Sequence, residues 1–321
     1  MPTKFLRRAL VPACAALLLA GSLATAQAAE FINILTGGTS GVYYPLGVAL
    51  SQIYSKAIPE AKSSVQSTKA SAENLNLLQA GRGEIAFVLG DALADAWNGN
   101  AEAGFNKPLK KLRSVAAIYS NYIQIVASAD SGIKTLADLK GKRVSVGAPK
   151  SGTELNARAV LKGAGLSYKD LGKVEYLPFG ESVELMKNRQ LDATLISAGL
   201  GVSAIRDLAT SVKIVIVQIP PAVVAKIGNP AYQSAVIPAN TYEGQTADAH
   251  TVAIHNVLVT RADMPTDTVY KMTKALFSNL PEMVAAHAAA KGIKLEDAIK
   301  GLPAPLHPGA EKYYREVGLI K

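Results

Sequence analysis

Cysteine is almost absent from this chain of 321 residues. The single one, Cys14, falls inside an N-terminal apolar stretch that we expect to be removed. The mature protein would therefore have no disulfide, no thiolate nucleophile and no cysteine-bound metal. About 290 remaining residues bury a core large enough to be stable without disulfides, and this length favours two domains over one.

Long apolar runs are also absent beyond that N-terminal segment. Three basic residues within the first eight precede the charge-free stretch from Ala9 to Ala26, and small residues follow. This pattern is typical of a secretory signal peptide with cleavage near Ala28, whereas a retained membrane anchor would carry a charged flank after the apolar stretch. No later stretch approaches the roughly 18 apolar residues of a membrane span. We expect residues 1–28 to be cleaved and the mature protein to be exported to the periplasm.

Acidic residues are too few to balance the basic ones, so the formal net charge is +9, or +6 without the three basic residues of the signal peptide. This surplus slightly favours anionic partners. The Lys and Arg residues are scattered, however, and no basic run contains interleaved aromatic residues. We expect a small anionic or zwitterionic ligand and no nucleic acid.

The first part of the mature chain alternates strand and helix patterns. Strands are predicted at 31–35, 65–68 and 85–89, and helices at 45–57 and 71–79. This order implies parallel strands with covering helices. Residues 112–128 are almost continuously apolar, which is too long for one ordinary strand and indicates a chain that leaves one sheet and enters another.

The second part repeats the strand, glycine-rich turn and helix of the first. After a short helix at 133–139, a strand at 143–146 leads into the turn 147–153 and a helix at 154–162. Further strands are predicted at 174–177, 193–196 and 213–219, and helices at 182–189 and 202–209. No regular element is predicted in the Pro- and Gly-containing region 220–244. The strand 251–260 returns the chain to the first sheet, and helices at 266–280, 282–290 and 309–317 follow.

These patterns predict an α/β protein of two lobes joined by two crossing segments. The first lobe would comprise residues 29–120 and 253–321, and the second lobe, residues 121–252, would be inserted into it. A cleft between the lobes would hold the ligand.

The stretch ILTGGTSGVYYPLG, residues 34–47, joins the first predicted strand to the first predicted helix. Its glycines match neither the Walker A spacing nor G-x-G-x-x-G. Ser40 lies directly before Gly41, so the G-x-S-x-G elbow of serine hydrolases is missing as well. We therefore predict no catalytic residue, no cofactor and no metal. An exported hydrolase using Ser40 or Ser151 with a histidine stays as the alternative from another class.

Anion recognition by the backbone fits both glycine-rich turns. Glycine lets the main chain approach a ligand closely, and a helix N-terminus directs unpaired N–H groups and a partial positive charge at it. Two such turns, one per lobe, predict that a small carboxylate is bound between the lobes. Alternatively, the glycines only form tight turns and the hydroxyls only cap helices. Secondary candidates lie at other strand ends: Ser67, Thr68, Ser71, Asp91, Ser197 and Gly199.

Several segments, in this order, resemble the TAXI family, the extracytoplasmic solute receptors of TRAP transporters. They are ILTGGTSGVYYPLG, Ser71 to Leu75, Phe87 to Asp91, GKRVSVGAPKSGTELNAR from Gly141 to Arg158, and Leu191 to Ala193. The likeness runs from about residue 31 to the C-terminus. Lys150 departs from it, because a small residue is expected there. It would be either an extra cation for the ligand or a surface side chain.

The resemblance implies a type II periplasmic-binding-protein fold and delivery of the ligand to a sodium-coupled TRAP membrane subunit. We expect the protein to be a monomer. Ligands in relatives include glutamate, glutamine and 2-oxoglutarate. A receptor that serves a sensor kinase is a further alternative. Together with the strand-end argument for Ser71, the resemblance gives these expected ligand-binding residues: Thr36, Gly38, Thr39, Ser40, Tyr43, Ser71, Asp91, Ser151, Gly152 and Thr153.

Overall fold

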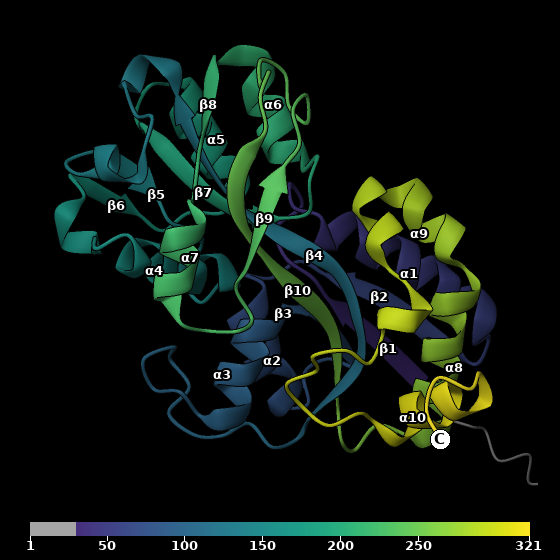
Figure 1. Cartoon of the computed structure of the whole chain (residues 1–321). Helices are drawn as coiled ribbons and strands as arrows, with labels where there is room; N and C mark the ends of the chain where they lie inside the picture. Colours follow the sequence, from purple (N-terminus) through teal and green to yellow (C-terminus); the bar gives the residue numbers. More distant parts are fainter. Residues whose placement is uncertain (1–29) are drawn as a thin grey trace, which may run out of the picture.

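Two α/β lobes share one mixed sheet of ten strands (Figure 1). The computed structural model describes residues 30–321, so the predicted signal peptide lies outside the described residues. The order along the sheet is β2-β1-β3-β10-β4-β7-β5-β6, while β8 pairs with β4 and β9 with β10. The α/β, two-lobed fold predicted from the sequence is confirmed.

Parallel strands form the outer part of each lobe. In the first lobe they are β1 (Glu30–Leu35), β2 (Ala61–Gln66) and β3 (Ile85–Leu89). In the second they are β5 (Arg143–Ser145), β6 (Lys173–Glu175) and β7 (Ala193–Ala198). β8 (Ile214–Val217) and β9 (Gln233–Ile237) complete the second lobe.

Two long strands, β4 (Leu112–Ser128) and β10 (Ala249–Arg261), pair with each other and run through both lobes (Figure 1). The first part of β4 pairs with β10, whereas its last residues pair with β7 and β8. The expectation that residues 112–128 leave one sheet for another was therefore wrong. The run is one strand of 17 residues, and it can be this long because each part has its own neighbours.

Helices cover both faces of the sheet. On one face lie α1 (Tyr43–Ala57), α5 (Phe179–Lys187), α6 (Ser203–Ser211), α8 (Thr266–Ser278), α9 (Leu280–Ala286) and α10 (Pro308–Glu316). On the other lie α2 (Ser71–Gln79), α3 (Gly90–Asn98), α4 (Gly152–Gly163) and α7 (Pro221–Ile227). Each face has its own continuous apolar core, which is the burial expected of a three-layer α/β fold.

Several predicted element bounds were wrong. Residues 220–244 contain α7 and β9, although neither was predicted, and α3 was missed after β3. The side chains of β9 mostly face solvent, and α7 has only 7 residues, so neither element shows a clear apolar period. Of 133–139, only Leu136–Leu139 is helical, as a 3-10 turn.

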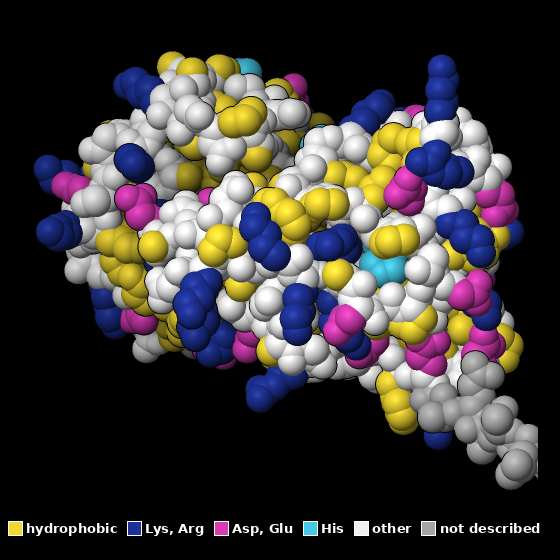
Figure 2. All heavy atoms as spheres, turned by 90° about the horizontal axis from the view of Figure 1, so that it is seen from below, with side chains coloured by type: hydrophobic (Ala, Val, Ile, Leu, Met, Phe, Trp, Pro, Cys, Tyr) yellow, Lys and Arg dark blue, Asp and Glu magenta, His cyan; other side chains and the backbone are white. Residues whose placement is uncertain are grey.

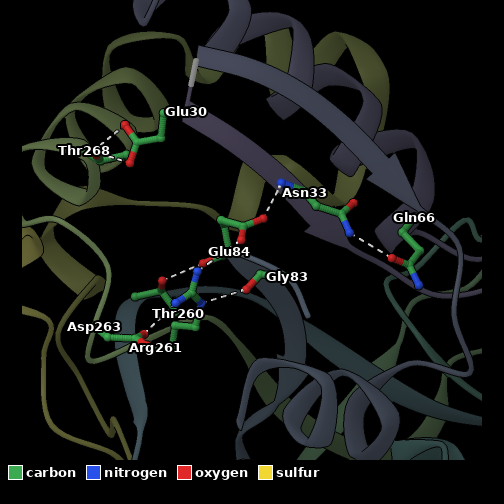
Figure 3. Close-up of polar contacts among 9 residues, drawn as sticks. All are labelled: Glu30, Asn33, Gln66, Gly83, Glu84, Thr260, Arg261, Asp263 and Thr268. Carbon is green, nitrogen blue, oxygen red and sulfur yellow. Dashed lines mark hydrogen bonds and ion pairs between the residues drawn. The ribbon is translucent and has the colours of Figure 1, made fainter. Parts of the chain in front are cut away.

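The end of the first lobe farthest from the second is held by a group of polar contacts around Arg261 (Figure 3). Its guanidinium pairs with the Glu84 carboxylate at 3.2 Å and with Asp263 at 2.7 Å. The other Glu84 oxygen accepts a hydrogen bond from the backbone N–H of Asn33 at 2.8 Å. These contacts fix the end of β10 against β1 and the start of β3.

The surface carries no obvious single-sign region on the face shown in Figure 2, where Lys and Arg side chains are spread among acidic and uncharged ones. Within residues 30–321, no helix combines the length and apolar character needed to cross a membrane.

Candidate functional site

A cavity of about 370 Å³ lies between the lobes, where the carboxyl ends of their parallel strands meet. The first lobe contributes the turn 37–41 after β1 and residues 67–71 after β2. The second lobe contributes residues 151–153 after β5, residues 178–181 after β6 and the end of β7. Ligands of open α/β sheets bind at this edge.

The first glycine-rich turn, residues 37–41, presents hydroxyls that do not cap the following helix. Gly41 N–H donates to the Gly38 carbonyl at 3.0 Å, which closes the turn. The N-cap of α1 is Val42, and no side chain caps this N-terminus. The hydroxyls of Thr39 and Ser40 therefore do not cap α1. Helix capping does not explain why this turn carries hydroxyl side chains.

The second glycine-rich turn combines a cap with a close contact between the lobes. Ser151 Oγ accepts a hydrogen bond from Glu154 N–H at 3.1 Å and caps α4, so the capping alternative does apply to Ser151. A Cβ at Gly152 would come within 2.6 Å of Leu89 and 2.7 Å of Ser71 Oγ. Only glycine lets the α4 N-terminus approach the first lobe this closely.

The structure places eight of the ten expected ligand-binding residues around the cavity. They are Gly38, Thr39, Ser40, Tyr43, Ser71, Ser151, Gly152 and Thr153. Two secondary candidates after β2, Ser67 and Thr68, also line it, as does Ser197, whereas Gly199 does not. Lys150 is exposed and outside the lining, which corresponds to the surface alternative for this side chain.

Thr36 lies outside the lining because its polar groups hold strand ends together. Its hydroxyl donates to the Gln66 carbonyl at 2.8 Å, and its carbonyl accepts from Asn74 Nδ2 at 2.7 Å. The side chain is fully buried. Its contacts are those of a structural residue beneath the first turn.

Asp91 also lies outside the lining, in a contact between the lobes. Its carboxylate, only 2 % exposed, accepts hydrogen bonds from Tyr232 OH at 2.6 Å and from Asn156 Nδ2 at 2.7 Å. Burial raises the pKa of Asp91 to about 6, although these hydrogen bonds oppose the increase. The residue belongs to the first lobe and both donors belong to the second, so its contacts hold the lobes together.

Sequence reasoning missed several lining residues. Tyr119 and Asn121 of β4 form part of the wall, and Lys69, Phe179 and Glu181 also line the cavity. The β4 pair lies in the middle of a long apolar run, where a tyrosine and an asparagine looked like ordinary strand residues. The polar Asn121 within that apolar run could have indicated a special position, because a buried amide in a central strand needs specific hydrogen-bond partners.

Those partners form a hydrogen-bonded chain beneath the cavity. Tyr43 OH donates to Asn256 Oδ1, and Asn256 Nδ2 donates to Asn121 Oδ1 at 2.8 Å. Asn121 Nδ2 in turn donates to the Ser197 carbonyl at 3.0 Å. The chain passes from α1 through both crossing strands to β7, so it joins the two lobes beneath the cavity.

No histidine from residues 30–321 lines this cavity. His307 is buried against Met264 and the start of α10, and His287 caps a 3-10 turn. His255 faces a second cavity of about 460 Å³, beside Ser120 and Lys300. Within the described part of the chain, neither Ser40 nor Ser151 has a histidine beside it in the cavity, and no three His, Cys, Asp or Glu side chains gather as a metal site.

A cleft between two α/β lobes linked by two crossing strands defines the type II periplasmic-binding-protein fold. The chain belongs to the NMT1-like family, whose model matches residues 34–318.

Solved structures share the fold at low sequence identity. PhnD1 from Prochlorococcus marinus (MIT 9301), in complex with methylphosphonate, is 12% identical with a TM-score of 0.58; the match covers 91% of this chain and 99% of that chain. XAC2383 from Xanthomonas citri bound to ATP is 11% identical with a TM-score of 0.52, over 90% and 97% of the two chains. A putative L-cystine ABC transporter from Listeria monocytogenes is 15% identical with a TM-score of 0.51, over 83% and 98%.

Proposed function

We propose that this protein is a periplasmic solute receptor that captures a small organic acid or amino acid, similar to glutamate or 2-oxoglutarate, between its lobes. The observation that carries the proposal is the cavity itself, into which both glycine-rich turns open. The first turn contributes hydroxyls that cap no helix, and four helices, α1, α2, α4 and α5, begin at the cavity wall. Helix N-termini favour anionic groups without a full positive charge.

The binding cycle follows from the contacts between the lobes. Ser203 Oγ donates to the Ser40 carbonyl at 2.9 Å, and the Glu73 amide donates to the Lys150 carbonyl at 3.2 Å. Both contacts span the cleft, and opening must break them. We infer that a ligand bridging the turns stabilises this closed form, with 29–120 and 253–321 moving as one lobe and 121–252 as the other.

The receiving partner in this proposal is a sodium-coupled TRAP membrane subunit, as the resemblance to TAXI receptors implies. An ATP-driven transporter is the second candidate, because one structural neighbour is a putative L-cystine ABC transporter. Uptake into vesicles that contain the partner distinguishes them. Dependence on a sodium gradient supports the first, whereas dependence on ATP supports the second.

The test of binding is a thermal-shift screen of the purified mature chain with amino acids, keto acids and dicarboxylates. A ligand at 100 times its Kd stabilises the folded state by about 2.7 kcal/mol. Thr39→Val and Ser151→Ala should each weaken the best ligand. If no acid raises the melting temperature, or if neither variant weakens the best one, the proposed binding site is wrong. Turnover of the ligand would instead support the hydrolase.

A further inference from the structure

Two hydroxyls in the cavity wall are buried without a partner. Tyr119 is 2 % exposed and Ser197 is 5 % exposed, and both line the cavity. Neither Tyr119 OH nor Ser197 Oγ forms a hydrogen bond within the described part of the chain. Most buried polar groups are paired, because an unpaired one loses its interactions with water without compensation. The missing partner here is explained if the ligand supplies it.

The two hydroxyls come from neighbouring strands, β4 and β7, that both reach the cavity wall. Tyr119 and Asn121 are two residues apart on β4, and Ser197 pairs with Ile123, two residues further along. Asn121 is already engaged through both ends of its amide, with Ser197 and Asn256. The two hydroxyls are therefore the hydrogen-bonding groups that remain unused on this part of the wall.

We propose that Tyr119 and Ser197 form a subsite that donates hydrogen bonds to an oxygen atom at the end of the ligand remote from its first carboxylate. The inference rests on the proposed function, in which that first carboxylate binds at the glycine-rich turns. It names the chemistry of the far end: a carbonyl, amide or carboxylate oxygen, in place of a methyl or an ammonium group.

The choice of an oxygen acceptor follows from the chemistry of the wall. Burial raises the pKa of Tyr119 well above its usual range, so the phenol keeps its proton and can donate it. The charged residues of the described lining, Lys69 and Glu181, are both exposed. An ammonium group beside Tyr119 would lose its hydration with no buried carboxylate in the lining to pair with it. A methyl group would leave both hydroxyls unsatisfied.

The chain offers a matched control for each hydroxyl. Thr194 lies on β7 like Ser197, and its Oγ1 is also buried without a partner, but it does not line the cavity. Tyr54 of α1 is likewise 1 % exposed with an unpartnered hydroxyl away from the cavity. Thr194→Val and Tyr54→Phe therefore remove equally unpaired hydroxyls where no ligand contact is expected.

The experiment uses titration calorimetry of the full mature chain with five-carbon acids that differ at one end. Glutarate carries a carboxylate there, glutaramate an amide, pentanoate a methyl and 5-aminopentanoate an ammonium. Glutarate and glutaramate should bind more tightly than the other two. Tyr119→Phe and Ser197→Ala should weaken glutaramate roughly 3- to 10-fold and glutarate roughly 10- to 100-fold, as for neutral and charged hydrogen bonds. The affinity for pentanoate should change less than about 2-fold in Tyr119→Phe and Ser197→Ala. The affinities for all four acids should change less than about 2-fold in the two control variants.

The outcomes separate this subsite from the proposed function. Equal affinity for pentanoate and glutarate, or an equal loss for both in Tyr119→Phe, would overturn the subsite while leaving acid binding intact. Tighter binding of 5-aminopentanoate than of glutarate would also overturn the subsite. If none of the four acids, nor glutamate or 2-oxoglutarate, binds at millimolar concentration, the proposed function fails and the subsite fails with it.

Discussion

Replacing Asp91 by asparagine should stabilise the protein at neutral pH. In the folded protein the pKa of this carboxyl rises from 3.8 to about 6 because of burial, with Asp95 nearby adding to the increase. A carboxyl whose pKa is raised in the folded protein does not lower the stability at a pH below its unfolded pKa. Its ionisation lowers the free energy of unfolding increasingly as the pH rises from the unfolded pKa through the folded pKa. At about 1.4 kcal/mol per pH unit, the difference between these two pKa values costs about 3 kcal/mol at pH 7.

Asparagine removes this cost but loses one hydrogen bond. Asp91 accepts from the Ala92 amide through one oxygen, and from Tyr232 and Asn156 through the other. An amide cannot accept on both sides, so about 1 kcal/mol is lost. The net gain for Asp91→Asn should be about 2 kcal/mol at pH 7, and it should disappear between about pH 5 and pH 4.

The assay is urea denaturation of the ligand-free protein and its variants at several pH values from 4.5 to 8. Tyr232→Phe is the opposite control. Its hydroxyl stabilises the charged carboxylate, so its loss should destabilise the protein by about 1.5 to 3 kcal/mol at pH 7 and by less at pH 5. If Asp91→Asn is less stable than the parent at pH 7, with an unchanged pH profile, the charged carboxylate is net stabilising and the reasoning is refuted.

Two further predictions concern the packing of the lobes. Gly152→Ala should destabilise the protein by about 1 to 3 kcal/mol in denaturant titrations, because its Cβ would meet Leu89 and Ser71. Gly38→Ala, with no atom within 4 Å of its Cβ, should change stability by less than about 0.5 kcal/mol. Equal effects of the two substitutions would contradict the close contact between the lobes at Gly152. Arg261→Ala should lower stability by about 1 to 2 kcal/mol, because it leaves the largely buried Glu84 without its cation; an unchanged melting temperature would show that the contacts in Figure 3 do not stabilise the first lobe.

The alternating part of the fold could be predicted from the sequence because its strands and helices carry clear apolar periods. β1 and β3 are buried runs bounded by turns, and α1 places Leu46, Leu50 and Ile53 on one buried face. β9 lacked such a signal, since its place depends on pairing with β10 rather than on its own side chains. For β4, the apolar run was visible, but its continuity through two lobes depends on partners distant in the chain.

The candidate site was predictable where local chemistry defines it. The glycines and hydroxyls of both turns are visible in the sequence, and the structure brings them to one cavity. Asp91 follows a strand end just as Ser71 does, but the sequence does not reveal that Tyr232 and Asn156 come across from the other lobe to meet it. Tyr119 and Asn256 became recognisable only when the two crossing strands were seen side by side.

The most direct test of ligand binding between the lobes is a crystal structure of the mature protein with the acid that binds most tightly in the thermal-shift screen. Binding in the cavity predicts one ligand carboxylate within hydrogen-bond distance of the turn 37–41 and of residues 151–153, with both lobes in contact with the ligand. A ligand bound only in the second cavity beside His255, or only to one lobe, would contradict it.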